Sequence, residues 1–172
     1  MLTHSRARGM AESLWGNGGT ISTRTSRPGA FYFSCSGHGG FVIDDRAFTE
    51  QERAAISPYA KPFKTNEIYN PARGDVVAMQ NPFASRPRTI RYAAGSIVRI
   101  AKIWTFEEDC DWCLPTVFAG ITLKGRDPSG AIDSFARWHA KSNHQLIEAR
   151  GAFARHFPDH QTPAPAPHAQ EA

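Results

Sequence analysis

One stretch of the sequence carries the strongest fold signal: Phe31-Tyr32-Phe33-Ser34-Cys35-Ser36-Gly37-His38-Gly39-Gly40-Phe41-Val42-Ile43. Two apolar, β-prone runs flank a glycine-rich turn, which is the pattern of two strands joined by a tight bend. The turn carries a thiol at Cys35 and an imidazole at His38, so a candidate chemical site coincides with a structural corner. The stretch therefore predicts a strand pair, with strands at residues 30–35 and 41–43.

Length and composition predict a folded, cytoplasmic protein. The chain has 172 residues, of which 41% are hydrophobic and 11% aromatic, enough to bury a full core. Its net charge of +4 permits an acidic partner such as nucleic acid without requiring one. No apolar run reaches the roughly 18 residues of a membrane span, so no membrane partner is expected. Three cysteines, an odd number, fit a reducing compartment.

The periodic patterns predict an α+β fold, in which an antiparallel sheet is packed by a long C-terminal helix. Strand patterns occur at residues 20–25, 30–35, 41–43, 74–79 and 96–106. The long helix is predicted from apolar residues at three- and four-residue steps between Ile132 and Phe157, with a polar gap at Ser142-Asn143. We expect its apolar stripe to pack on the sheet.

Shorter signals predict the remaining elements and the domain limits. Thr49 and Glu52 have the spacing of a capping box and predict a short helix that ends before Pro58. A loop is predicted at residues 58–70. A β-hairpin is predicted whose two strands span residues 88–92 and 96–106. The single domain is expected to span residues 13–158. Residues 1–12, which are polar and aperiodic, and the Pro/Ala-rich tail at 159–172 are predicted to be disordered.

The three cysteines lie in two closely spaced pairs that predict a zinc site. Cys35-x-x-His38 and Cys110-x-x-Cys113 each place two ligands on one turn, and structural zinc takes four such ligands in a tetrahedron. Zinc is the one cofactor that the sequence indicates. The alternative is that the cysteines are core thiols, the usual environment of free cysteine.

Acid–base chemistry is a second hypothesis for the same turn. His38 on a glycine turn can be exposed and act as a general base, oriented by a nearby carboxylate. The predicted catalytic residues are His38, Glu108 and Asp109, with Glu107 as a further acidic partner. The alternative is that His38 hydrogen-bonds a backbone carbonyl and fixes the turn.

Basic residues around the predicted hairpin indicate a nucleic-acid-binding surface. Arginine and lysine bind phosphates, and the interleaved aromatics Tyr92 and Trp104 can stack on bases. The alternative is a solvated face whose charges protect a sheet edge. The predicted binding residues are Arg86, Arg88, Arg91, Arg99 and Lys102.

Three short blocks resemble an uncharacterised domain family carried by plasmids and phages of proteobacteria. The blocks are Trp15-Gly16, Gly37-His38-Gly39-Gly40-Phe41 and Glu107-Glu108-Asp109-Cys110-Asp111-Trp112. The resemblance covers about half of the chain and implies that residues 63–104 are an inserted β-segment. It also implies mobile-element cargo, and small proteins of such cargo often antagonise host restriction or CRISPR systems.

The expected function is therefore that of a small phage or plasmid protein which antagonises a host defence system by binding a protein or nucleoprotein partner. One alternative is a small enzyme that uses His38 with Glu107, Glu108 and Asp109. The other is a zinc-stabilised nucleic-acid-binding module.

Overall fold

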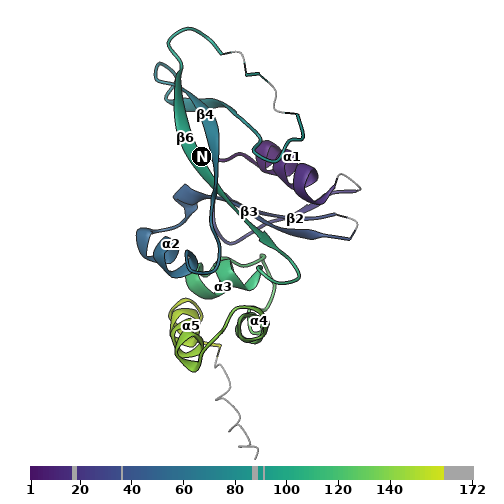
Figure 1. Cartoon of the computed structure of the whole chain (residues 1–172), viewed down its shortest axis with the longest axis vertical. Coiled ribbons are helices and arrows are strands. Elements are labelled where there is room, and N and C mark those ends of the chain that lie inside the picture. Colours follow the sequence, from purple (N-terminus) through teal and green to yellow (C-terminus); the bar gives the residue numbers. More distant parts are fainter. Residues whose placement is uncertain (17–18, 36, 87–88, 91, 161–172) are drawn as a thin grey trace, which may run out of the picture.

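The computed structural model describes residues 1–16, 19–35, 37–86, 89–90 and 92–160, and these residues form an α+β fold (Figure 1). An antiparallel six-stranded sheet has the strand order β1-β2-β3-β6-β4-β5. Its strands are β1 (Ile21–Thr23), β2 (Ala30–Ser34), β3 (Gly39–Asp44), β4 (Phe63–Asn70), β5 (Asp75–Met79) and β6 (Ile97–Glu107). The α-helices are α1 (His4–Trp15), α2 (Glu50–Ile56), α3 (Cys113–Ala119), α4 (Gly130–Trp138) and α5 (Asn143–His156), and a short 3-10 helix spans Asp45–Ala47. No helix in this described part of the chain has the length and hydropathy needed to cross a membrane.

The strand pair predicted around the glycine turn is confirmed. β2 and β3 are antiparallel, with Phe31 opposite Val42, and β1 pairs with β2 to complete a three-stranded meander. β6 then lies between β3 and β4, with Phe106 opposite Phe41. The centre of the sheet therefore joins the first half of the chain to the second.

The predicted hairpin over residues 88–106 is wrong. β6 pairs with β4, which occupies residues that were predicted as a loop, and residues 89, 90 and 92 are not in a strand. β4 is polar in sequence, yet Thr65 and Glu67 are buried by its neighbours. Such burial depends on packing that local propensity does not contain. The segment at 63–104 supplies β4, β5 and most of β6, so it is an integral part of the sheet.

The prediction that residues 1–12 are disordered is also wrong, because α1 occupies most of this segment. Ala7, Met10 and Ala11 lie at helical spacing and are buried against Val42 and Ile103 of the sheet. A stripe of two alanines and one methionine carries too little apolar character to be recognised in an arginine-rich sequence. The domain therefore includes the N-terminal residues, whereas residues 161–172 of the predicted tail lie outside the described residues.

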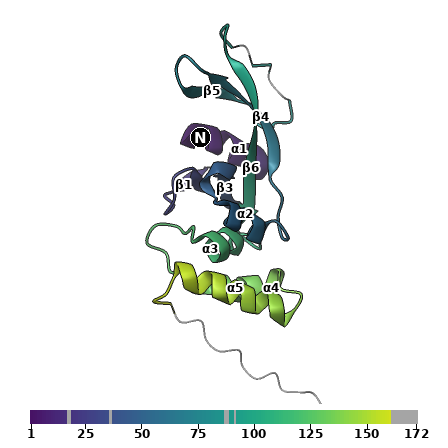
Figure 2. The same ribbon diagram turned by 90° about the vertical axis from the view of Figure 1, so that its left-hand side faces the viewer.

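The C-terminal helix is divided into two helices at the polar gap. Ser142 caps α5, its hydroxyl accepting a hydrogen bond from the Gln145 N–H at 3.3 Å. α4 and α5 pack against each other and against α3, which lies between them and the sheet (Figure 2). The apolar stripe therefore reaches the sheet mainly through α3. The short helix that was predicted to start after Thr49 and end before Pro58 is confirmed as α2. Its capping box is complete, because the Thr49 side chain accepts from the Glu52 N–H and the Glu52 side chain accepts from the Thr49 N–H.

The sheet is buried on both faces where β3 meets the second half of β6. One face packs against α2 to α5 through Phe41, Trp104 and Phe106. The opposite face packs against α1 through Val42 and Ile103. The outer ends of β4 and β6 extend beyond the helices, so the first residues of β6 are exposed (Figure 1).

Candidate functional site

The end of β6 lies beside the glycine turn that leads into β3. Gly40 is opposite Glu107 in the sheet register, and the Glu108 N–H donates a hydrogen bond to the Gly39 carbonyl at 2.9 Å. Successive side chains of a strand project from opposite faces, so Glu107 and Glu108 point in opposite directions. The acidic block thus contributes to two separate sites, one on each face of the sheet.

On one face, Glu107 and Asp109 converge on His38. The Nδ1 atom of His38 lies 3.3 Å from a carboxylate oxygen of Glu107, and one ligand atom from each of the three residues lies within 4.8 Å of the others. The His38 side chain is 57% exposed and that of Glu107 is 41% exposed. The predicted grouping of His38 with Asp109 is thus present, but Glu108 belongs to the other face.

Replacing His38 by alanine is expected to change the free energy of unfolding by no more than about 0.5 kcal/mol, because exposed ion pairs contribute little. The turn is closed by a backbone bond, in which the Cys35 N–H donates to the His38 carbonyl at 2.7 Å, and alanine retains that bond. Urea denaturation of the two proteins provides the measurement. A loss above about 2 kcal/mol would show instead that the imidazole fixes the turn.

The predicted four-ligand zinc site is not assembled. Among the residues that the structure describes, the one convergent group of possible metal ligands contains no cysteine. Cys35 is buried with its sulfur 3.5 Å from the Thr20 hydroxyl, and Cys113 is fully buried at the start of α3. Burial raises the pKa of Cys113 to about 12, and burial together with the Asp111 carboxylate raises the pKa of Cys110 to about 11. Cys35 and Cys113 are therefore core thiols, and Cys110 and Cys113 are held as neutral thiols.

The predicted basic surface does not form one face. Arg99 and Lys102 are three positions apart on β6 and project from opposite faces of the sheet. The Arg99 guanidinium stacks over the Tyr69 ring at 3.5 Å from its centroid, and Lys102 is opposite Lys64. Arg86 is exposed in the loop after β5, and the remaining two predicted residues, Arg88 and Arg91, lie outside the described residues.

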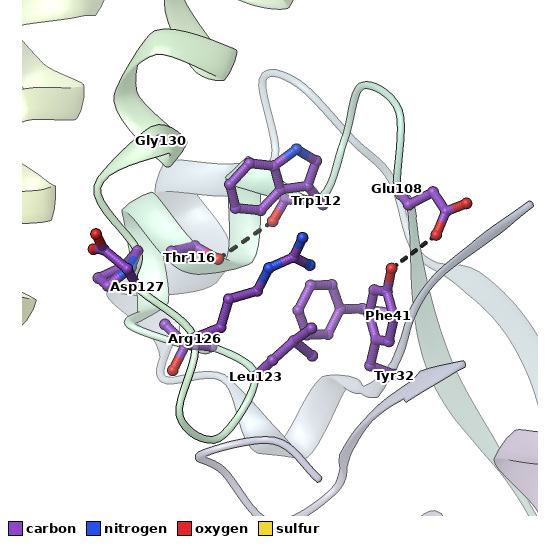
Figure 3. Close-up of a pocket in the computed structure, with 11 residues that line it drawn as sticks. Tyr32, Phe41, Glu108, Trp112, Thr116, Leu123, Arg126, Asp127 and Gly130 are labelled. Atoms are coloured by element: carbon purple, nitrogen blue, oxygen red, sulfur yellow. Dashed lines mark hydrogen bonds between the residues drawn. The ribbon is translucent and has the colours of Figure 1, made fainter. Parts of the chain in front are cut away.

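A pocket on the second face was not predicted. It encloses about 400 Å³ between the sheet, the start of α3 and the loop that precedes α4 (Figure 3). Tyr32 and Phe41 line it from β2 and β3, Trp112 lines it from the turn before α3, and Arg126 extends into it from the loop. Glu108 stands at one end, next to Tyr32.

The polar end of the pocket is organised by a buried phenol. The Tyr32 hydroxyl donates a hydrogen bond to Glu108 Oε2 at 2.8 Å. Burial and the neighbouring Glu108 carboxylate raise the pKa of Tyr32 to about 12, an effect that the Arg126 guanidinium partly opposes. Tyr32 therefore remains a neutral donor at physiological pH, which holds Glu108 as an acceptor rather than making Tyr32 a base.

Comparison of the chain with protein-family models, with curated protein sequences and with solved structures found no match. Tyr32 and Glu108 are 76 positions apart, so only the pairing of β3 with β6 reveals their contact. The one local signal for the pocket was Trp112, an aromatic residue in an otherwise polar, acidic block.

Proposed function

We propose that the protein is a non-enzymatic binding protein of a phage or plasmid, which antagonises a host restriction or CRISPR system by engaging a nucleoprotein partner. The family resemblance of the three sequence blocks supplies the biological setting. One exposed surface of the sheet supports the binding role and carries the proposal.

That surface, the distal β4–β6 face, consists of Lys64, Val98, Ile100 and Lys102. Residues directly opposite each other on paired strands share a face, and Lys64 is opposite Lys102. Ile100 is 64% exposed and Val98 is 51% exposed, beyond the cover of the helices. The face thus combines two apolar side chains with two cations, and the described residues of β4 and β6 place no carboxylate among them.

This combination fits a partner that presents both protein and phosphate groups. Exposed apolar side chains gathered on a strand mark a protein contact, because water does not stabilise them there. Lysines attract phosphates and other anions. A nuclease bound to its nucleic acid offers both chemistries on one surface, whereas free nucleic acid would leave Ile100 and Val98 without an apolar contact.

Ile100→Glu is expected to abolish antagonism, because it removes the apolar contact and places a carboxylate beside Lys102, two positions further along β6 on the same face. The measurement is the transformation efficiency of a plasmid into hosts that carry an active restriction or CRISPR system directed against it. We expect the wild-type protein to raise this efficiency and the variant to lose about tenfold or more of the effect.

Ile147→Glu is the matched control, because Ile147 on α5 is 66% exposed at the other end of the molecule. It should retain the wild-type effect. Equal loss or equal retention in both variants would contradict a role for the distal β4–β6 face. No effect of the wild-type protein against either system would contradict the antagonist function itself.

A second candidate function is acid–base or cation-assisted chemistry at His38. It is favoured by the convergence of His38, Glu107 and Asp109 within 4.8 Å, since an imidazole with two carboxylates can hold a proton or a divalent cation. Calorimetric titration with Mn²⁺ and Zn²⁺ tests the cation. Binding that is lost in His38→Ala would support this function, and no binding to the wild-type protein would contradict the cation-assisted form.

A further inference from the structure

The pocket between Tyr32, Trp112 and Arg126 has the size of a small-ligand site. Its volume of about 400 Å³ lies within the range of roughly 300–1,000 Å³ that is usual for ligand pockets. Neither the distal β4–β6 face nor the His38 cluster includes any of its lining residues. The pocket is therefore available for a recognition event of its own.

The walls of the pocket are suited to a flat ring. Phe41 forms part of the floor, Leu123 forms one side, and the Trp112 indole forms another (Figure 3). Phe41 is held rigidly, since it is only 2% exposed and its ring contacts the Tyr32 ring edge-on at 5.1 Å between centroids. Trp112 is only partly buried, and an exposed indole face can stack on nucleobases irrespective of sequence.

Two groups of opposite charge face the pocket: Glu108 at one end, and Arg126, whose side chain extends between Trp112 and the rings of Phe41 and Tyr32 (Figure 3). Glu108 Oε2 accepts a hydrogen bond from the Tyr32 hydroxyl. Its other carboxylate oxygen accepts none from the residues that the structure describes. Arg126 is exposed and makes no ion pair with any carboxylate in the described part of the chain. The adjacent Asp127 is instead bound to Ser129 and His160. A matching ligand has an N–H donor on a flat ring and an anionic group that can reach Arg126.

We propose that this pocket binds one unpaired nucleotide, with its base stacked against Trp112, an exocyclic amino group donating to Glu108, and its phosphate on Arg126. Carboxylates accept from the amino group of cytosine, and arginine binds phosphate through two parallel hydrogen bonds. The inference rests on the proposed function, because a nucleoprotein partner is what would present an unpaired nucleotide to the pocket.

The test is fluorescence anisotropy with two labelled single strands, a short oligodeoxycytidine and a short oligothymidine. Thymine presents a carbonyl where cytosine presents its amino group, so oligothymidine should bind about tenfold more weakly. Arg126→Ala should weaken binding of both strands by about tenfold or more. Glu108→Gln should reduce the ratio of affinities for oligodeoxycytidine over oligothymidine, because the glutamine amide can also donate to the thymine carbonyl.

Arg137→Ala is the control, since Arg137 is an exposed arginine on α4 away from the pocket. It should bind both strands as the wild-type protein does.

Equal affinity of the wild type for the two strands, or equal effects of the two arginine variants, would overturn the proposal. Displacement of the strand by phosphotyrosine at lower concentration than by cytidine monophosphate would also overturn it, in favour of a phosphopeptide. The assay needs no partner protein, so its failure leaves the Ile100→Glu experiment intact, and the reverse also holds.

Discussion

Gly40→Ala is expected to lower the free energy of unfolding by more than about 3 kcal/mol, because the new methyl group would overlap the backbone of the neighbouring strand. A Cβ atom at this position would lie 2.1 Å from the Phe106 carbonyl oxygen and 2.9 Å from its carbonyl carbon. Gly40 also has a φ of +152°, which residues with side chains rarely adopt. The β3–β6 pairing at the centre of the sheet would have to open. Chemical denaturation followed by circular dichroism measures the loss.

Gly9→Ala provides the comparison, because Gly9 lies within α1 and a Cβ there would meet no atom within 4 Å. This variant should be as stable as the wild type or more stable by about 0.5–1 kcal/mol, since alanine favours the helix. If Gly40→Ala unfolded at the same denaturant midpoint as Gly9→Ala, that result would contradict the close approach of β3 to β6 at Gly40.

Asp44→Ala is the second substitution with a large expected effect, at about 3 kcal/mol of lost stability. Asp44 is only 1% exposed, and its carboxylate accepts from the Leu2 N–H at 2.6 Å and from the Arg46 guanidinium at 2.8 Å. Arg46 in turn binds the buried Glu67 of β4 at 2.9 Å. Removing Asp44 leaves the Leu2 N–H without its acceptor and takes one of two carboxylate partners from Arg46, which keeps Glu67. It also loosens the N-terminal residues together with the β3 end of the sheet.

The pH dependence of stability tests whether the charge of the Asp44 carboxylate causes the loss of stability in Asp44 variants. Burial alone would raise the pKa of Asp44, but hydrogen bonds from Arg46 and Leu2 outweigh burial and hold the pKa below its ordinary value. A lowered pKa in the folded state contributes stability above the unfolded value of about 3.9, and this stability is lost as the pH falls through the folded pKa. The free energy of unfolding of the wild type should therefore exceed that of Asp44→Asn by the largest amount at neutral pH, and this difference should decrease in acid.

Asp133→Asn is the control for this titration, because Asp133 is exposed on α4. Its effect should stay within about 1 kcal/mol at every pH. Denaturation curves of the three proteins between about pH 7 and pH 3 provide the measurement. A stability difference for Asp44→Asn that did not change with pH would show that packing, rather than charge, accounts for its effect.

The sequence alone determined the features that depend on near neighbours. The bend between β2 and β3 is indicated by the glycine-rich run Gly37-His38-Gly39-Gly40 between two apolar, β-prone runs. The capping box of α2 needs only Thr49 and Glu52, three positions apart. The gap at Ser142-Asn143, which divides α4 from α5, is visible for the same reason. The convergence of His38 with Asp109 was predicted from residue chemistry, as one of several open groupings.

Only the tertiary structure decided which distant segments meet. α1 and β4 are too polar to be identified by themselves, and each is stabilised by the surface it covers or pairs with. The placement of β6 beside β3 brought Glu107 next to His38 and Glu108 next to Tyr32. A strand alternates its side chains wherever it lies, but the partner on each face is set by long-range pairing. The contact between Tyr32 and Glu108, which forms one end of the pocket, depends on that pairing.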